Sequence, residues 1–256
     1  MKDLFGGAAP FYAKYRADHG DPAIDHLART FGPDAVVLDL GCGPGTVAIP
    51  LARRVRAVLA VDPDEEMLAE GRRLAADVPN IRWLRGDSTR LRELPPFGHV
   101  VMGRSFHWMD RRAVLADLDD LLPPGGVVAL VGPGRGAVEE PWEPVMRRVR
   151  ERFGADDSLT KAPGTFQATG EHPHDVLPGS PFPDLESVHD EQRLAYDLDA
   201  VLGLQLSYSF TAPARLGDRL PAFVAEARAA LLAANPSGRW EMVRITEVLI
   251  ARRSAR

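Results

Sequence analysis

Three glycines at alternate positions follow a short apolar run, and this segment carries the clearest chemical signal in the chain. Residues 36–40 read Val-Val-Leu-Asp-Leu, and Gly41, Gly43 and Gly45 come next. Glycine permits a tight turn and lets a ligand lie against the main chain with no Cβ between them. A helix that begins after such a turn points its first N–H groups at the ligand. The segment therefore predicts a ligand-binding loop between a strand and a helix.

Two acidic residues near this loop indicate the kind of ligand. Asp39 lies near the end of the apolar run, just before Leu40, where it would repel the pyrophosphate of a dinucleotide and attract positively charged groups. Asp62 ends the next apolar run, about 20 residues after the first glycine, where a carboxylate can accept two hydrogen bonds from ribose hydroxyls. Thr46 occupies the third glycine position of the dinucleotide fingerprint, and the Gly-Lys-Ser/Thr of a P-loop is missing. These details disfavour a nicotinamide dinucleotide or a nucleoside triphosphate as the ligand of the glycine loop.

Polar side chains also follow the fourth apolar run of the chain. His107 could act as a general base at the sheet edge where open α/β folds bind ligands, or it could pack the next helix beside Trp108. Arg104 and Ser105 could contact cofactor or substrate, or could form a solvated turn. His107 is the candidate catalytic residue.

An aromatic and basic segment lies near the N-terminus. Tyr12, Tyr15 and Arg16 could close over a ligand, with Arg16 attracting a carboxylate. The alternative is an ordinary amphipathic helix with two packed tyrosines. We favour closure.

Two further features allow a simpler interpretation. Residues 171–175 read Glu-His-Pro-His-Asp, which are metal-ligand types, but the proline and the missing distant ligands favour a surface loop, and we expect no metal site. Cys42 is the single cysteine, so the chain has no intrachain disulfide, and its place in the glycine turn suits a small residue under the ligand.

The elements that must position these residues alternate between strands and helices in the first half of the chain, as in a parallel α/β sheet. Helices are expected over residues 46–55, from Pro63 onward and over 111–122. The expected strands are residues 36–40, 57–61, 81–84, 99–102 and 127–131.

The second half changes character, because glycine and proline concentrate between residues 132 and 183. We expect a helix at 141–153, a loop-rich insertion at 154–183, a strand at 186–196, a helix at 220–234 and a last strand at 240–250. The predicted fold is a Rossmann-like doubly wound sheet of about seven strands, mostly parallel with an antiparallel last strand, plus a cap insertion. The expected organisation is one domain over 1–256, with a cofactor-binding core at 10–132, a Gly/Pro-rich cap at 133–185, and C-terminal strands and helices at 186–256.

Composition narrows the class of protein. The chain has 256 residues, 26% charged and 45% hydrophobic, with a formal net charge of -5. These fractions are typical of a soluble globular protein, and the acidic balance disfavours a nucleic-acid partner. Neither a signal peptide nor a run of about 20 apolar residues is evident, so we expect a cytoplasmic protein without a membrane partner. A homo-oligomer is compatible with these observations.

Taken together, these segments resemble the class I S-adenosylmethionine-dependent methyltransferases, specifically the small-molecule type 11 group. Residues 37–45 match the first motif of that family, 61–68 the second and 85–88 the third, and 106–110 resemble its recurring His-Trp segment. Residues 11–16 are similar to the helix that closes over the cofactor, and 240–250 to the antiparallel seventh strand. After the fourth strand the chain departs from the Asn/Asp-Pro-Pro-Tyr of nucleic-acid amino methylases.

The resemblance implies S-adenosylmethionine as cofactor and S-adenosylhomocysteine as product. It implies that the glycine loop wraps the methionine part, Asp62 binds the ribose, Pro63 or Met67 lies against the adenine, and Asp87 with Ser88 lies near its amino group. The expected cofactor site thus comprises Asp39, Gly41, Cys42, Gly43, Gly45, Asp62, Pro63, Met67, Asp87, Ser88, Arg104, Tyr12, Tyr15 and Arg16.

The function that follows is methyl transfer to an N or O nucleophile of a small molecule, expected to be a specialised natural product. One alternative is carboxyl O-methylation of a small organic acid, for which Arg16, Arg104 and Arg147 would converge on the pocket. Another is a non-catalytic module that binds S-adenosylmethionine. A nicotinamide oxidoreductase is disfavoured by Asp39 and Thr46.

Overall fold

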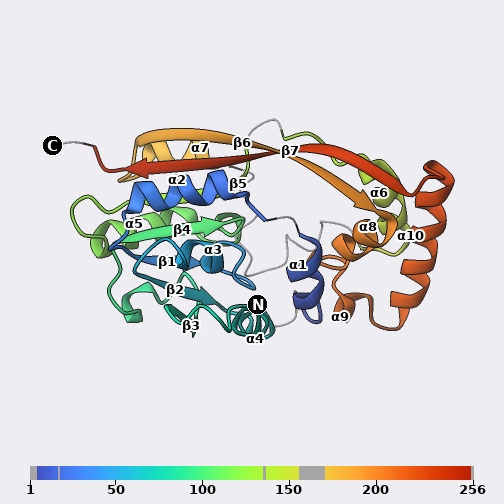
Figure 1. Ribbon diagram of the computed structural model, residues 1–256, viewed down its shortest axis with the longest axis horizontal. Helices are drawn as coiled ribbons and strands as arrows, with labels where there is room; N and C mark the ends of the chain where they lie inside the picture. The colour runs from blue at the N-terminus through green and yellow to red at the C-terminus, as the bar shows by residue number, and fades with distance from the viewer. Residues whose placement is uncertain (1–4, 17, 135–136, 156–170, 255–256) are drawn as a thin grey trace. The chain divides into compact units, whose positions relative to one another are not determined.

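The computed structural model describes residues 5–16, 18–134, 137–155 and 171–254, which form a seven-stranded sheet with helices (Figure 1). The strand order is β3-β2-β1-β4-β5-β7-β6. The strands are β1 (Val36–Leu40), β2 (Ala57–Asp62), β3 (Ile81–Arg85), β4 (His99–Gly103), β5 (Val128–Pro133), β6 (Asp184–Asp197) and β7 (Arg239–Arg252). The helices are α1 (Ala9–Tyr15), α2 (Asp21–Phe31), α3 (Ala48–Ala52), α4 (Glu65–Leu74), α5 (Arg111–Leu121), α6 (Glu143–Arg152), α7 (Pro173–Val176), α8 (Leu198–Gln205), α9 (Pro213–Leu216) and α10 (Leu220–Ala234).

The contacts divide the chain into two compact units. We call one the sheet unit (Asp18–Gly134, Gly164–Asp190 and Ile245–Arg256) and the other the helical unit (Met1–Ala17, Arg135–Pro163 and Glu191–Arg244). The domain boundaries expected from the sequence, with a core at 10–132 and a cap at 133–185, stay predictions.

The sheet confirms the predicted fold class. Strands β1 to β5 pair in parallel in the order β3-β2-β1-β4-β5, and β7 pairs antiparallel to β5. In the register, Leu40 lies opposite Val61, so the glycine loop after β1 begins beside Asp62 at the end of β2. The order changes direction between β1 and β4, and ligands of doubly wound sheets bind at such a switch point.

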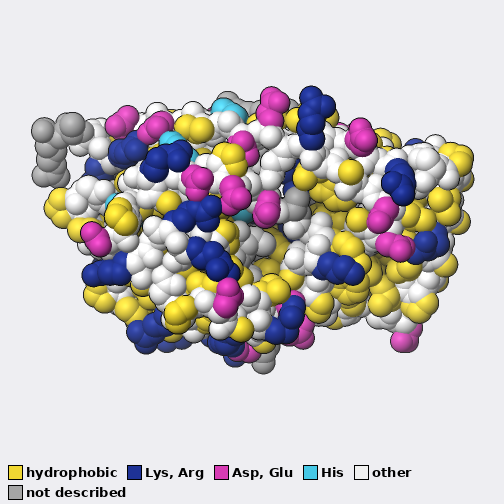
Figure 2. Space-filling view, in the orientation of Figure 1, with side chains coloured by type: hydrophobic (Ala, Val, Ile, Leu, Met, Phe, Trp, Pro, Cys, Tyr) yellow, Lys and Arg dark blue, Asp and Glu magenta, His cyan; other side chains and the backbone are white. Residues whose placement is uncertain are grey.

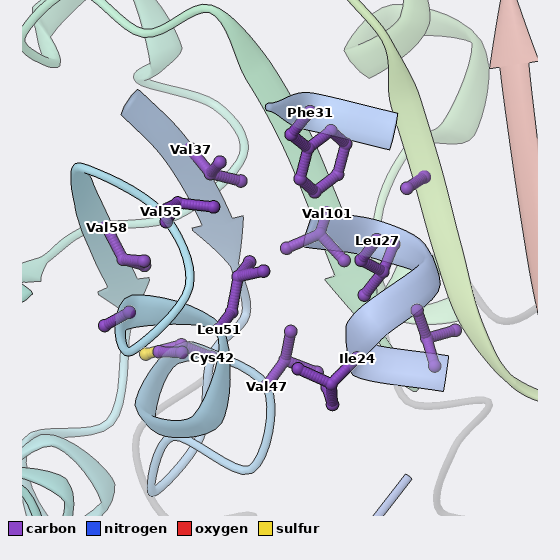
Figure 3. Close-up of a cluster of buried hydrophobic side chains, with 14 of the residues drawn as sticks. Ile24, Leu27, Phe31, Val37, Cys42, Val47, Leu51, Val55, Val58 and Val101 are labelled. Atoms are coloured by element: carbon purple, nitrogen blue, oxygen red, sulfur yellow. The ribbon is translucent and has the colours of Figure 1, made fainter. Parts of the chain in front are cut away.

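Apolar side chains from alternate strand positions fill both faces of the sheet. On one face, Leu27 and Phe31 of α2 and Leu51 of α3 pack against β1, β2 and β4 (Figure 3). On the other face, Leu115 and Leu118 of α5 pack with side chains of β4 and β5. Because both faces are covered, the strands read as continuous apolar runs rather than alternating ones.

Two helices of the sheet unit begin later than expected. α4 begins at Glu65, because Asp64 is its N-cap and accepts hydrogen bonds from the amides of Glu66 and Met67. Pro63 therefore precedes the cap rather than occupying the first turn, which corrects the sequence expectation. The helix expected over 46–55 is α-helical only at Ala48–Ala52, since the glycine loop extends through residue 47.

The helical unit has a core of its own, built from α1, α6, α8 and α10. Trp142 is fully buried there, with ring centroids 4.8 Å from Tyr196 and 6.2 Å from Trp240. α8 and α9 were not expected from the sequence. The expected helices at 141–153 and 220–234 correspond to α6 and α10, and the expected strands at 186–196 and 240–250 to β6 and β7.

Candidate functional site

The glycine loop is tied to β2 and has one open side. The amides of Gly41 and Cys42 both donate to the carbonyl of Val61, at 2.8 and 3.0 Å. All three glycines have positive φ (74°, 53° and 88°). A Cβ at Gly41 would stand 2.5 Å from Cβ of Ser105, whereas a Cβ at Gly43 would have no atom within 4 Å. The structure therefore leaves open space beside the main chain at Gly43.

Asp39 is a buried carboxylate without a hydrogen-bond partner. It is 1% exposed, and neither oxygen accepts a hydrogen bond within the described residues. Burial raises its pKa to about 7; the backbone amide of Ala48 opposes this shift without forming a bond of normal geometry, and the nearby Asp62 adds to it. An isolated buried carboxylate destabilises the fold. A cationic ligand group in the loop would supply the missing partner, and the ammonium of S-adenosylmethionine is such a group.

Asp62 is positioned by two backbone amides. Its Oδ2 accepts from Gly43 at 2.8 Å and its Oδ1 from Asp64 at 2.9 Å. Burial raises the pKa of Asp62 to about 6, although both amides oppose the shift. Each oxygen keeps one lone pair for a further donor. The carboxylate is thus fixed against the glycine loop, while Asp64 is the N-cap of α4. A ribose contact of Asp62 stays a prediction.

The residues expected around the adenine lie at the ends of β2 and β3. Met67 is buried in α4 and Pro63 is half-buried beside Asp62. Asp87 follows β3, and its Oδ1 accepts from the amide and the hydroxyl of Thr89 at 2.9 and 2.5 Å. Ser88 is half-buried in the same turn. Their adenine contacts stay predictions.

Arg104 and Ser105 lie at the switch point, directly after β4. Ser105 is buried, and its hydroxyl donates to the carbonyl of Leu40 at 2.6 Å, which excludes a solvated turn at that residue. Arg104 has a φ of 54°, the one positive value of a described non-glycine residue. Such a conformation costs about 1–2 kcal/mol, and strained residues of this kind cluster at functional sites.

Two further candidates of the sheet unit are His107, which is half-buried, and Cys42, which is buried. His107 lies on a short 3-10 helix, with its ring centroid 5.1 Å from that of Trp108. Its role as a base stays a prediction.

Cys42 is 5% exposed and packs in the cluster under the loop (Figure 3), and burial raises its thiol pKa far above the ordinary value. A thiol of this kind is a small packed residue rather than a nucleophile.

The expected closing residues belong to the helical unit. Tyr15 packs on Gly203, where a Cβ would stand 2.2 Å from the tyrosine ring. The Arg16 guanidinium lies 4.2 Å from the ring of Tyr12 and bonds the hydroxyl and carbonyl of Ser207. These contacts give Tyr15 and Arg16 structural partners, and their role in cofactor binding stays a prediction.

The structure also brings together residues that sequence reasoning missed. His174, from the segment with metal-ligand residue types, contacts Glu247 of β7, and Ser187 and His189 of β6 lie beside the same carboxylate. No group of three or more His, Cys, Asp or Glu among the described residues is arranged to hold a metal ion. Trp83 was also missed; its indole fills the space left by Gly45 and Gly71.

Comparison with known proteins agrees with this geometry. Residues 37–126 match the family model described as a methyltransferase domain. A trans-aconitate 2-methyltransferase of Methylobacterium nodulans is 35% identical over 142 residues, which cover 54% of this chain and 53% of that protein. An uncharacterized methyltransferase of Mycobacterium tuberculosis is 43% identical over 98 residues, 37% of this chain and 49% of that one. The chain thus spans about half the length of the curated relatives it matches.

Solved structures resemble the whole chain. A protein from Anaeromyxobacter dehalogenans, provisionally named a type II methyltransferase, has a TM-score of 0.61 at 26% identity and covers 93% of this chain and 98% of its own. A methyltransferase from Geobacter sulfurreducens, solved with S-adenosylhomocysteine, has the same fold, with a TM-score of 0.53 at 13% identity over 99% of both chains. Residues 37–126 thus match a methyltransferase domain, and the fold of the chain is that of the class I S-adenosylmethionine-dependent methyltransferases.

Proposed function

We propose that the protein binds S-adenosylmethionine and transfers its methyl group to a nitrogen or oxygen nucleophile of a small molecule. The observation that carries this proposal is the unpartnered carboxylate of Asp39 under an accessible glycine loop. A buried charge without a partner costs stability in the free protein, and a bound cation would remove that cost. The burial of Asp39 therefore supports a role in binding a cation.

The residues of the sheet unit fit the cofactor part by part. Asp39 would face its ammonium group, the main chain at Gly43 its methionine part, Asp62 its ribose, and Asp87 its adenine. When bound, the cofactor supplies a methyl group on a sulfonium, which is already an activated electrophile. The protein then contributes mainly alignment, which can provide roughly 7–11 kcal/mol of a reaction barrier.

The acceptor is proposed to be a small metabolite, specialised natural products being the expected class. On the face of Figure 2, acidic and basic side chains are interspersed rather than gathered by sign, which is unlike a phosphate-binding stripe. No described helix is both long and apolar enough to cross a bilayer. A cytoplasmic location and a homo-oligomer belong to the same proposal.

A second candidate is carboxyl O-methylation of a small organic acid. Several curated relatives are trans-aconitate 2-methyltransferases, and the strained Arg104 could bind a carboxylate. Arg147, which the sequence suggested for the same role, is half-exposed and pairs with Glu139 and Glu143 of its own unit. Trans-aconitate is therefore the first acid to test.

Calorimetry with S-adenosylhomocysteine and NAD tests the proposal. We expect saturable binding of S-adenosylhomocysteine and none of NAD, and the reverse result would assign the protein to the oxidoreductases. Labelled methyl donor with a polar bacterial metabolite extract, and separately with trans-aconitate, then identifies the acceptor. Binding without transfer to either would favour the non-catalytic module.

A further inference from the structure

A buried glutamate lies at the carboxyl end of β5, opposite the last residues of that strand. Glu247 is 7% exposed and pairs with Gly132 in the antiparallel ladder of β5 and β7. A Cβ at Gly134 would stand 3.1 Å from Oε2 of Glu247. Glycine at 134 therefore makes room for this carboxylate.

Three side chains from two other segments converge on one oxygen of Glu247. Nε2 of His174 lies 2.8 Å from Oε1, the hydroxyl of Ser187 donates to the same atom, and Nε2 of His189 lies 3.6 Å away. Burial alone would raise the pKa of Glu247, but the hydrogen bonds from Ser187 and His174 outweigh it and lower the pKa. The carboxylate is therefore ionised near neutral pH and can only accept hydrogen bonds.

This contact determines which nitrogen of His174 can act as a base. Since the carboxylate accepts, Nε2 of the neutral imidazole carries the proton and Nδ1 keeps its lone pair. No described residue bonds Nδ1, and the atom is not among the buried unpartnered ones. A base oriented by a carboxylate on its far nitrogen is the arrangement by which imidazoles activate nucleophiles in several enzyme classes.

The backbone around His174 is anchored on both sides. α7 begins with a capping box formed by His172 and Asp175, and the His172 ring stacks on that of His174 at 5.2 Å and 11°. Val176 and Leu177, which follow, are buried in the core under α5. The imidazole is thus held in place from its own segment as well as by Glu247.

The pair lies at the edge of the sheet where an acceptor would bind. β4 and β5 are neighbours, and β4 in turn neighbours β1, which carries the glycine loop. A Cβ at Gly132 would stand 3.4 Å from Cγ of Arg104, so the side chain of Arg104 lies against the end of β5. Glu247 of β7 pairs with Gly132 at this same end of β5. Ligands of doubly wound sheets bind outside these strand ends.

We propose that His174, positioned by Glu247, takes the proton from the hydroxyl or amine that is methylated. The inference rests on the proposed function. The acceptor atom forms the new bond to carbon, the carbon–sulfur bond breaks with its electron pair left on sulfur, and the acceptor's proton goes to Nδ1 of His174 and then to water. A carboxylate acceptor is already deprotonated at neutral pH and would need no base. A base at this position therefore implies that the methylated group is a hydroxyl or an amine.

The first test needs no acceptor. Long-range 15N–1H NMR of the whole labelled protein reports which nitrogen of the neutral His174 imidazole carries the proton. We expect the Nε2–H form in the wild type and a weaker preference for it in Glu247→Gln. An Nδ1–H form would leave no lone pair toward the acceptor and would overturn the proposal.

The second test compares two histidines on one carboxylate. With labelled methyl donor and the polar metabolite extract, we expect His174→Ala to lower the transfer rate about 10²–10⁴-fold. His189→Ala, the more exposed and more distant neighbour, should change it less than threefold. Glu247→Gln should also lower the rate, because the imidazole loses the carboxylate that orients it. If His174→Ala fails to fold, His174→Gln replaces it with the same expected loss.

Different results would overturn the role of His174 as a base and the proposed methyl transfer. All variants should bind S-adenosylhomocysteine as the wild type does, since none touches the glycine loop. A wild-type rate and pH profile in His174→Ala would overturn the base and leave methyl transfer intact. Absence of S-adenosylhomocysteine binding in the wild type would instead overturn the proposed function itself.

Discussion

The hydroxyl of Ser105 donates a buried hydrogen bond of 2.6 Å to the carbonyl of Leu40, which joins the end of β4 to the end of β1. The same serine occupies the space beside Gly41, where a Cβ would be 2.5 Å from its own. The switch point of the sheet is therefore stabilised by one side chain that also shapes the glycine loop. This contact links the stability of the fold to the geometry of the cofactor site.

Ser105→Ala should lower the free energy of unfolding by about 1–2 kcal/mol, because a buried hydrogen bond is lost. It should also weaken S-adenosylhomocysteine binding severalfold, since the start of the glycine loop loses its tie from the end of β4 to the carbonyl of Leu40. Urea denaturation and calorimetry measure the two effects. Ser88→Ala is the control for stability, because the half-buried Ser88 hydroxyl has no hydrogen bond within the described residues. Equal stability of both variants would contradict the role of this bond.

Asp39→Asn should stabilise the ligand-free protein at pH 8 while it weakens cofactor binding. The folded pKa of Asp39 is about 7 against an ordinary value of 3.8, so the native state binds the proton more tightly than the unfolded chain. Stability therefore falls as pH rises from about 4 to about 7, by roughly 1.4 kcal/mol for each pKa unit. Removing the charge removes this loss.

Urea denaturation of both proteins at pH 5 and pH 8 measures the difference, which should be a few kcal/mol at pH 8 and smaller at pH 5. Asp34→Asn, at an exposed carboxylate just before β1, is the matched control and should change neither stability nor affinity appreciably. A variant less stable than the wild type at pH 8 would show that Asp39 has a partner within the free fold.

The parts of the site that sequence reasoning could predict are those determined by local pattern. Asp39 and Asp62 lie at the ends of apolar strands and Gly43 follows the first of them, and parallel pairing then brings the strand ends together. The pairing of Glu247 with Gly132 could not be predicted in this way, because it depends on the register of an antiparallel strand more than 100 residues away in sequence.

Packing between distant segments was equally inaccessible. Tyr15 faces Gly203, and no local signal in either segment indicates the other. The histidines at 172 and 174 were recognised as chemically suggestive but were assigned to a surface loop, since the missing partner, Glu247, lies in the last strand. The residue types at 172 and 174 indicated possible chemistry, but only the tertiary structure shows that Glu247 is the partner of His174.

Asp62→Ala should weaken S-adenosylhomocysteine binding about 10–100-fold, because the variant would lose both the ribose hydrogen bonds proposed for this carboxylate and its tether to Gly43. Asp64→Ala is the matched control. It removes the N-cap of α4, which costs about 1 kcal/mol of stability, but should change affinity no more than threefold. Calorimetry and thermal unfolding of both variants separate the roles. Similar affinity losses in the two would count against the ribose assignment.

Gly71→Ala should destabilise the protein, although alanine is the better helix former by about 1 kcal/mol. Gly71 lies within α4, and a Cβ there would stand 2.4 Å from the indole of Trp83, which also touches the Cβ position of Gly45 at 2.7 Å. The ring is rigid and has backbone on both sides, so we expect a net loss of about 1–3 kcal/mol and weaker S-adenosylhomocysteine binding through Gly45. In a Trp83→Leu background the clash disappears, and the same substitution should become neutral or stabilising. Urea denaturation of the four proteins gives the coupling energy, and a stabilising effect of Gly71→Ala in the wild type would refute the close packing of Trp83 on both glycines.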